Sequence, residues 1–225
     1  MTAKVGASVR IILASASPRR EALLTQIGLA FRVEPSGVSE EEAGRSGDPA
    51  SFVEQAALAK AEEVAARVGD GLVLGADTVV VIGGEVLGKP ASIADAREML
   101  ARLSNATHEV YTGLALVLVS GGNVVRRRVG HEITRVTFRA LTPEDIEGYV
   151  ATGEPTDKAG AYGIQGRGAA LVERIEGCYF NVVGLPLARL VEMLREFGVS
   201  VWEQDPPMPG HPHPASPRSA GSGQA

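Results

Sequence analysis

An apolar run between residues 72 and 90 (LVLGADTVVVIGGEVLGKP) dominates the hydrophobic pattern of the chain. Its Val, Leu and Ile residues, bounded by glycines, predict a strand that is buried on both faces. The pair Gly83 and Gly84 predicts a two-residue turn. Folding about this turn sets three pairs of residues opposite each other: Ile82 with Glu85, Val80 with Leu87, and Thr78 with Lys89.

Asp77 interrupts this apolar run. An unpaired carboxylate at such a position loses its hydration, so another group must compensate its charge. Lys89 returns beside it, but Asp77 and Thr78 point to opposite faces, and a direct pair with Lys89 then needs a bulge or a strand end. Two interpretations stay open: a structural acid satisfied by backbone donors, or a functional carboxylate.

Residues 10–14 (RIILA) predict a first buried strand, which turns directly into a helix. Ser17 is a suitable N-cap, with Pro18 at the first helical position. Arg19 and Arg20 then stand in the first turn, where the helix dipole disfavours cations. A bound phosphate would remove this conflict, and the alternative is two solvated surface arginines.

A second helix is predicted from Asp48 and Pro49 to about Val68. Its apolar stripe contains Lys60, which either extends along the apolar surface to solvent or reaches into a pocket. The acidic loop before this helix includes Glu40, Glu41 and Glu42. Such a loop is either solvated or supplies one carboxylate to a hard cation such as Mg²⁺.

The second half of the chain predicts a mixed or antiparallel sheet with further helices. Ser92 with Asp95 predicts a capping box. Expected strands are 109–119, 124–139, 171–175 and 179–183, and expected helices run from Ser92 through Leu103, from Thr142 to Val150 and over 186–197.

A glycine-rich stretch over residues 153–168 (GEPTDKAGAYGIQGRG) holds five glycines among 16 residues. Glycines at this density let a backbone approach a ligand closely, and the amide of Gln165 can contact the edge of a nucleobase. The alternative is a flexible surface loop. Neither of the common glycine motifs for dinucleotides or phosphates occurs here.

Composition narrows the function classes. The chain has 225 residues, 44% hydrophobic side chains and a net charge of −5, which argues against nonspecific nucleic-acid binding. Its single cysteine, Cys178, excludes an intramolecular disulfide. No apolar run reaches the length of a membrane span and no secretory signal is recognisable, so a cytoplasmic protein with no membrane contact is expected.

The last 23 residues differ from the rest, because they contain six of the 13 prolines and little apolar bulk. A folded domain over residues 1–202 and a disordered Pro/Ser/Gly-rich tail over 203–225 are therefore expected. His211 and His213 in this tail are weak candidates for metal binding.

Five motifs together resemble the Maf family of nucleoside triphosphate pyrophosphatases over about residues 10–198. They are SASPRR at 15–20, GADTVV at 75–80, GKP at 88–90, EPTDKAGAYGIQGRGA at 154–169 and VVGLPL at 182–187. The resemblance implies an α/β fold, with an elongated mixed sheet flanked by helices and two lobes around a central cleft, similar to inosine triphosphate pyrophosphatases. It also implies a homodimer and a divalent cation, Mg²⁺ or Mn²⁺.

The resemblance further assigns roles to individual residues. Asp77 matches the family's proton acceptor and, with Glu40, its metal site, although Ser39 stands where many relatives have a second acid, so Glu41 and Glu42 stay as alternatives to Glu40. The remaining expected site residues are the cations Lys60 and Lys89, the substrate-binding residues Ser15, Arg20 and Lys158, and the specificity positions Arg19, Thr78 and Gln165.

The IQG form of the glycine-rich stretch resembles the branch that acts on dTTP and UTP. The implied reaction is hydrolysis between the α and β phosphates to the monophosphate and pyrophosphate, which extends to modified pyrimidine nucleotides. The alternative is a nucleotide-sensing inhibitor of septum formation that acts through a protein partner.

Overall fold

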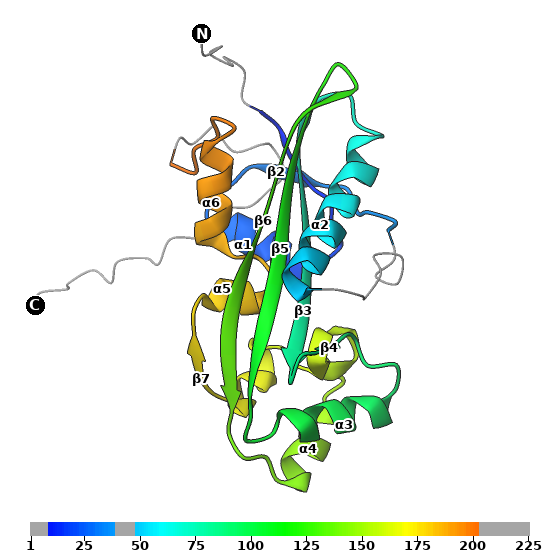
Figure 1. Cartoon of the computed structure of the whole chain (residues 1–225), viewed down its shortest axis with the longest axis vertical. Coiled ribbons are helices and arrows are strands. Elements are labelled where there is room, and N and C mark those ends of the chain that lie inside the picture. Colours follow the sequence, from blue (N-terminus) through cyan, green and yellow to red (C-terminus); the bar gives the residue numbers. More distant parts are fainter. Residues whose placement is uncertain (1–8, 39–47, 203–225) are drawn as a thin grey trace, which may run out of the picture.

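A seven-stranded mixed β-sheet forms the centre of the molecule (Figure 1). The computed structural model describes residues 9–38 and 48–202. The strand order is β2-β1-β3-β5-β6-β7, with β4 paired to β3; β1 is parallel to β2 and β3, and the other pairs are antiparallel. The strands are β1 (Ile11–Leu13), β2 (Phe31–Val33), β3 (Gly71–Ile82), β4 (Glu85–Leu87), β5 (Thr107–Ser120), β6 (Asn123–Phe138) and β7 (Val172–Glu176).

Helices cover both faces of this sheet, which confirms the expected α/β class. The α-helices are α1 (Pro18–Gln26), α2 (Pro49–Ala65), α3 (Ile93–Leu103), α4 (Pro143–Val150), α5 (Tyr179–Val183) and α6 (Leu187–Arg195). Helix α2 lies on one face, α1, α5 and α6 lie on the other, and α3 and α4 lie together at one end of the long strands (Figure 1). The glycine-rich stretch folds into the short 3₁₀ helices η1 (Glu154–Asp157), η2 (Ala159–Ala161) and η3 (Gly166–Leu171).

The predicted hairpin about Gly83 and Gly84 is confirmed in its register. Ile82 pairs with Glu85 and Val80 pairs with Leu87. The expected pair of Thr78 with Lys89 is wrong, because β4 ends at Leu87. Within the sheet Thr78 instead lies opposite Thr112 on β5.

Helix α2 approaches the sheet at two glycines. A Cβ atom at Gly75 would lie 2.1 Å from the carbonyl oxygen of Ala57, and one at Gly113 would lie 2.1 Å from that of Val53. Real Cβ atoms do not come this close to backbone. Because glycine has no Cβ, the backbone of α2 can pack directly against the sheet at these positions. This close packing sets the distance of the α2 side chains from β3.

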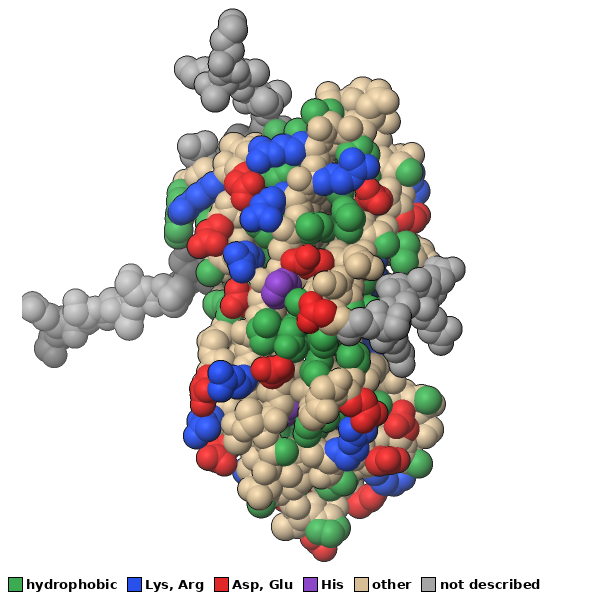
Figure 2. All heavy atoms as spheres, viewed as in Figure 1, with side chains coloured by type: hydrophobic (Ala, Val, Ile, Leu, Met, Phe, Trp, Pro, Cys, Tyr) green, Lys and Arg blue, Asp and Glu red, His purple; other side chains and the backbone are tan. Residues whose placement is uncertain are grey.

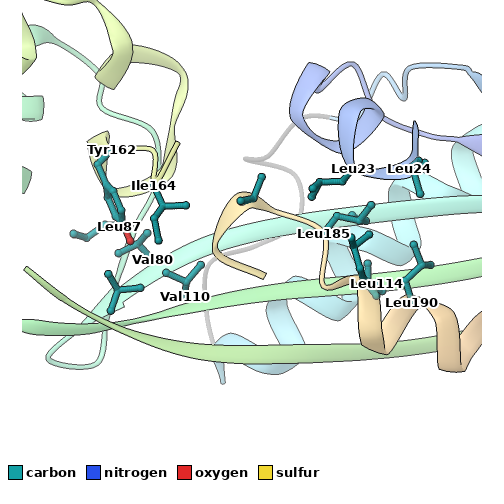
Figure 3. Close-up of a cluster of buried hydrophobic side chains, with 14 of the residues drawn as sticks. Leu23, Leu24, Val80, Leu87, Val110, Leu114, Tyr162, Ile164, Leu185 and Leu190 are labelled. Atoms are coloured by element: carbon teal, nitrogen blue, oxygen red, sulfur yellow. The ribbon is translucent and has the colours of Figure 1, made fainter. Parts of the chain in front are cut away.

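The larger core cluster lies on the opposite face of the sheet. Figure 3 shows its side chains in two groups along β3 and β5. One group joins the hairpin to the glycine-rich stretch, and the other packs α1 and α6 against the sheet. The labelled members of the first group are Val80, Leu87, Val110, Tyr162 and Ile164, and those of the second are Leu23, Leu24, Leu114, Leu185 and Leu190.

Two local expectations fail. Residues 179–183 form helix α5 and not a strand, because the buried amide of Asn181 donates to the carbonyl of Val110 and to Thr134 Oγ1 at 2.9 and 3.0 Å. The capping box of α3 is only half formed: Ser92 accepts from the backbone of Asp95, whose carboxylate accepts from Ala91 instead of Ser92. The complete box is that of α4, at Thr142.

Charges of both signs share the surface. Figure 2 shows acidic and basic side chains interleaved over the face in view, so they form no field of a single sign on that face. Ion pairs of β6 contribute to this mixture, with Arg126 and Arg128 on Glu196 and Arg127 on Glu62. Among the described helices, none combines the length and the apolar character that a membrane span requires.

Candidate active site

A cavity of about 450 Å³ opens where the start of α1, the middle of β3 and the glycine-rich stretch meet. This location matches the expected central cleft. Nine of the ten predicted site residues line it: Ser15, Arg19, Arg20, Lys60, Asp77, Thr78, Lys89, Lys158 and Gln165. The tenth, Glu40, lies with Glu41 and Glu42 outside the described residues, although Ser36 and Val38 of the same loop line the cavity.

Asp77 receives its compensating charge from Lys60. The ammonium Nζ lies 2.6 Å from Asp77 Oδ1, and the two side chains are 12% and 8% exposed. Lysine on the apolar stripe of α2 thus reaches into the cavity and does not extend to solvent. Removing one partner of such a buried pair strands the other charge, which typically costs about 3–5 kcal/mol.

Arg20 forms part of the cavity wall. Its guanidinium donates to the carbonyl oxygen of Gly184 at 2.9 Å, to Ser15 Oγ at 3.2 Å and to Thr78 Oγ1 at 3.1 Å. These three acceptors come from three separate elements, so the planar group holds them together. The helix-dipole argument singled out this residue as a possible phosphate ligand, and the hydrogen bonds described here go to neutral oxygens.

Arg19 connects α1 to the glycine-rich stretch. Its Nη1 atom lies 3.3 Å from Asp157 Oδ2, and the Nζ atom of Lys158 lies 2.6 Å from Asp157 Oδ1. Burial alone would raise the pKa of Asp157, but the hydrogen bonds and charges of Lys158 and Arg19 outweigh it and lower that pKa. The acid therefore stays ionised and ties two cations to one wall of the cavity.

Lys89 and Gln165 lie on exposed parts of the cavity lining. Lys89 follows the end of β4, so the hairpin brings its side chain to the cavity without pairing it to Thr78 in the sheet. Gln165 immediately precedes η3. Both positions leave the side chains accessible to a ligand that enters the cavity.

Sequence reasoning missed two polar residues at this site. Thr112 is fully buried, and its Oγ1 lies 3.0 Å from that of Thr78. The signal was present, because Thr112 interrupts the apolar run EVYTGLALVLV as Asp77 interrupts its own. Asp157 was noted only as a member of the glycine-rich stretch, and its partner Arg19 lies 138 positions away.

The cavity lining carries an excess of positive charge. Five cationic side chains and two acidic ones line it, in a chain whose net charge is −5. Cations that converge in a partly buried site attract anions more strongly than they would in water. The arrangement suits a ligand with several negative charges, such as a triphosphate.

A divalent cation fits this donor set if it binds together with such a ligand. Within the described residues no group of three or more His, Cys, Asp or Glu side chains could hold a metal ion alone. Mg²⁺ is usually bound through one or two carboxylates and completes its shell with water and phosphate oxygens. The carboxylate of Asp77, on the cavity wall, can supply one such ligand.

Comparison with solved structures gives matches of low similarity. A HAM1 protein from Coxiella burnetii is 18% identical, with a TM-score of 0.46, and the match covers 84% of this chain and 100% of that one. A nucleoside-triphosphatase named dITP/XTP pyrophosphatase from Mycobacterium abscessus is 15% identical, with a TM-score of 0.40, covering 84% of this chain and 95% of that one.

Sequence comparison gives much higher similarity. A protein of Moorella thermoacetica named dTTP/UTP pyrophosphatase is 60% identical over 193 residues, which are 86% of this chain and 97% of that protein. A protein of the same name from Gloeobacter violaceus is 54% identical, covering 84% and 97%. The sequence pattern of the family described as Maf-like protein matches residues 10–197, the span that contains every residue of the described cavity. The chain therefore belongs to the Maf-like protein family.

Proposed function

We propose that this protein is a nucleoside triphosphate pyrophosphatase that hydrolyses dTTP and UTP to the monophosphate and pyrophosphate. The observation that carries the proposal is the buried pair of Asp77 and Lys60 on the wall of a cavity with an excess of cationic side chains. The names of relatives at 50–60% identity support the choice of nucleotides. Modified pyrimidine triphosphates belong to the same substrate class.

In the proposed mechanism, Asp77 accepts a proton from the water that attacks the α phosphorus. Lys60 fixes the carboxylate through the 2.6 Å contact with Oδ1, so the acid does not need to reorganise during the reaction. Burial of both side chains keeps bulk water away from this contact. The two residues thus act together: Asp77 accepts the proton, and Lys60 orients the carboxylate of Asp77.

The remaining cationic side chains of the cavity bind the triphosphate. Arg19, Lys89 and Lys158 lie at separate points of the lining and offset its charge. A divalent cation held by Asp77, with Glu40 as the expected second ligand, would offset the negative charge that develops on the phosphates. Thr78 and Gln165 are the proposed contacts to the base.

The alternative, a nucleotide sensor that acts only by binding, leaves the Asp77–Lys60 pair without a role. The deciding experiment measures pyrophosphate release from a panel of dTTP, UTP, CTP, dATP, GTP and 7-methyl-GTP with Mg²⁺ or Mn²⁺. We expect release from dTTP and UTP foremost, and its loss when EDTA is added. Binding of dTTP without any release of pyrophosphate would refute the enzymatic proposal and support the sensor.

A homodimer and a cytoplasmic location complete the proposal. The homodimer rests on the family resemblance, and the location rests on the sequence features of the chain. Sedimentation of the purified protein tests the first part: we expect the mass of two chains, and a mass equal to one 23.4 kDa chain would contradict it.

A further inference from the structure

A chain of hydrogen bonds passes from the cavity into the sheet through two threonines. Thr78 and Thr112 lie opposite each other on β3 and β5, with their Oγ1 atoms 3.0 Å apart. Thr112 is completely buried, and its hydroxyl donates to the backbone carbonyl of Asn181 at 3.0 Å. A hydroxyl has one hydrogen, so Thr112 can only accept from Thr78.

The direction of donation is equally fixed for the hydrogen bond between Arg20 and Thr78. The guanidinium of Arg20 donates to Thr78 Oγ1 at 3.1 Å, because a guanidinium has no acceptor atom. A carbonyl oxygen, in turn, has no hydrogen to donate. The order of donation is therefore Arg20 to Thr78, Thr78 to Thr112, and Thr112 to the carbonyl of Asn181.

This order determines what Thr78 offers to a ligand. Its hydroxyl hydrogen points into the sheet toward Thr112, while the residue itself lines the cavity. Toward the cavity the oxygen can then act only as a hydrogen-bond acceptor. The oxygen therefore favours a ligand group with an N–H or O–H and disfavours a ligand group that is itself an acceptor.

Pyrimidine bases differ in this property at N3 and, in the opposite sense, at C4, where cytosine carries an amino donor and uracil and thymine carry a carbonyl acceptor. Uracil and thymine carry an imide N–H at N3, where cytosine carries an acceptor nitrogen. An oxygen that is held as an acceptor and faces N3 discriminates strongly between the two, because cytosine then leaves two acceptors facing each other.

We propose that Thr112 is a positioning residue for base selection: it commits the hydroxyl hydrogen of Thr78 to the sheet, so that Thr78 accepts the imide N–H of uracil or thymine and disfavours cytosine. The inference rests on the proposed hydrolysis of dTTP and UTP. It adds a residue that touches no substrate and lies below the cavity surface.

The carbonyl that anchors this chain is itself held firmly. Asn181 is fully buried, and its side-chain amide donates to the carbonyl of Val110 and to Thr134 Oγ1. Thr134 also accepts from the backbone N–H of Cys178 and donates to its carbonyl. Thr134 is thus a buried threonine that supports the same helix without contacting Thr78, which makes it a matched control.

The test compares Thr112→Val, Thr112→Ser and Thr134→Val. For each, kcat/KM is measured with UTP and with CTP, alongside the melting temperature. We expect Thr112→Val to lower the preference for UTP over CTP about tenfold, because Thr78 can then turn its hydrogen toward the base. Thr112→Ser keeps the hydroxyl and should retain the preference within about twofold, as should Thr134→Val, whatever its cost in stability.

Several outcomes would overturn the inference. Equal losses with both nucleotides in Thr112→Val, matching those of Thr134→Val, would make Thr112 merely structural. An unchanged preference in Thr112→Val would do the same. If that variant does not fold, N3-methyl-UTP tests the unaltered protein: the methyl group removes the imide hydrogen, and turnover equal to that of UTP would contradict the inference. Failure of the unaltered protein to hydrolyse UTP and dTTP at all would instead refute the proposed function.

Discussion

Each side chain of the ion pair between Asp77 and Lys60 affects both turnover and stability. We predict that Asp77→Asn lowers turnover at least about a hundredfold, because an amide cannot accept the proton of the attacking water. The fold should persist at lower stability, since the amide oxygen still accepts from Lys60 but no longer compensates its buried charge. Pyrophosphate release and the circular dichroism spectrum measure the two effects.

A matched control is Asp70→Asn, just before the start of the same strand. Asp70 accepts from the backbone N–H of Gly121 at 3.0 Å, which an amide oxygen can also do, and it lies outside the cavity. Its turnover should stay near that of the unaltered protein. Turnover of Asp77→Asn equal to that of Asp70→Asn would remove Asp77 from the mechanism.

The partner residue gives a second prediction, about coupling. Lys60→Met leaves the carboxylate of Asp77 buried without its counter-charge and should destabilise the protein by about 3 kcal/mol or more. In the double variant with Asp77→Asn no charge is stranded, so the double variant should be more stable than the sum of the single effects predicts. Chemical denaturation measures all four proteins, and simple additivity would contradict a coupled pair.

Lys60 also shows what could be predicted from residues alone. The stripe of α2 marked this lysine as unexpected on an apolar face, and the run of β3 marked Asp77 as an acid in need of a partner. Nothing in either pattern connected the two, because the contact depends on how α2 lies across the sheet. The hairpin register brought Lys89 beside Asp77 in the sequence analysis, because that register is set by a local turn.

At the scale of elements, the seating of α2 on the sheet determines whether Lys60 reaches Asp77. We predict that Gly113→Ala destabilises the protein by about 3 kcal/mol or more, since the new methyl group would meet the backbone of Val53 and must push the helix away. The displacement should also lower turnover. Denaturant unfolding and pyrophosphate release measure both.

Gly130→Ala is the matched control, on the neighbouring strand β6. The nearest atom to a Cβ there is Met193 Sδ at 3.7 Å, an ordinary contact with a flexible side chain. This variant should change stability by less than about 1 kcal/mol and leave turnover intact. Similar losses in both variants would show that glycine matters in this sheet for a reason other than the approach of α2.

The elements differ in how well sequence predicted them. The hairpin of β3 and β4 was predicted in register because its turn and its alternation are local. Helix α5 was misread as a strand because Tyr, Phe and Val favour strands, whereas its shape depends on contacts of Asn181 with β5 and β6. Gly184, at a φ of 118°, then ends the helix. In the sequence, Gly184 could not be told apart from the many other glycines as the residue that ends a helix.

For the whole molecule, the expected division into a domain over 1–202 and a tail over 203–225 stays a prediction. The family pattern ends at residue 197, and the described cavity lies entirely before it. Deleting residues 203–225 should therefore leave the melting temperature and the turnover of UTP unchanged. A loss of either on deletion would assign the tail a part in folding or in the reaction.

The buried His108 links the stability of the whole fold to pH. It is 1% exposed, its Nε2 lies 2.8 Å from the hydroxyl of Tyr162, and its ring packs edge-on against Phe138. Burial lowers the pKa of His108 from 6.5 to about 4. The imidazole is therefore neutral in the folded protein at pH values where the unfolded chain already binds a proton.

Because the folded pKa is the lower one, the contribution of His108 is fully present above pH 6.5 and is lost as the pH falls toward 4. Over this window the free energy of unfolding should fall by up to about 3 kcal/mol. His108→Gln removes the titrating ring, so its free energy of unfolding should depend less on pH between 6.5 and 4, although it starts lower at pH 7. Carboxylates with a lowered pKa, such as Asp157, act mainly below this window. Denaturant unfolding at several pH values measures both curves, and parallel curves would mean that His108 does not cause the loss.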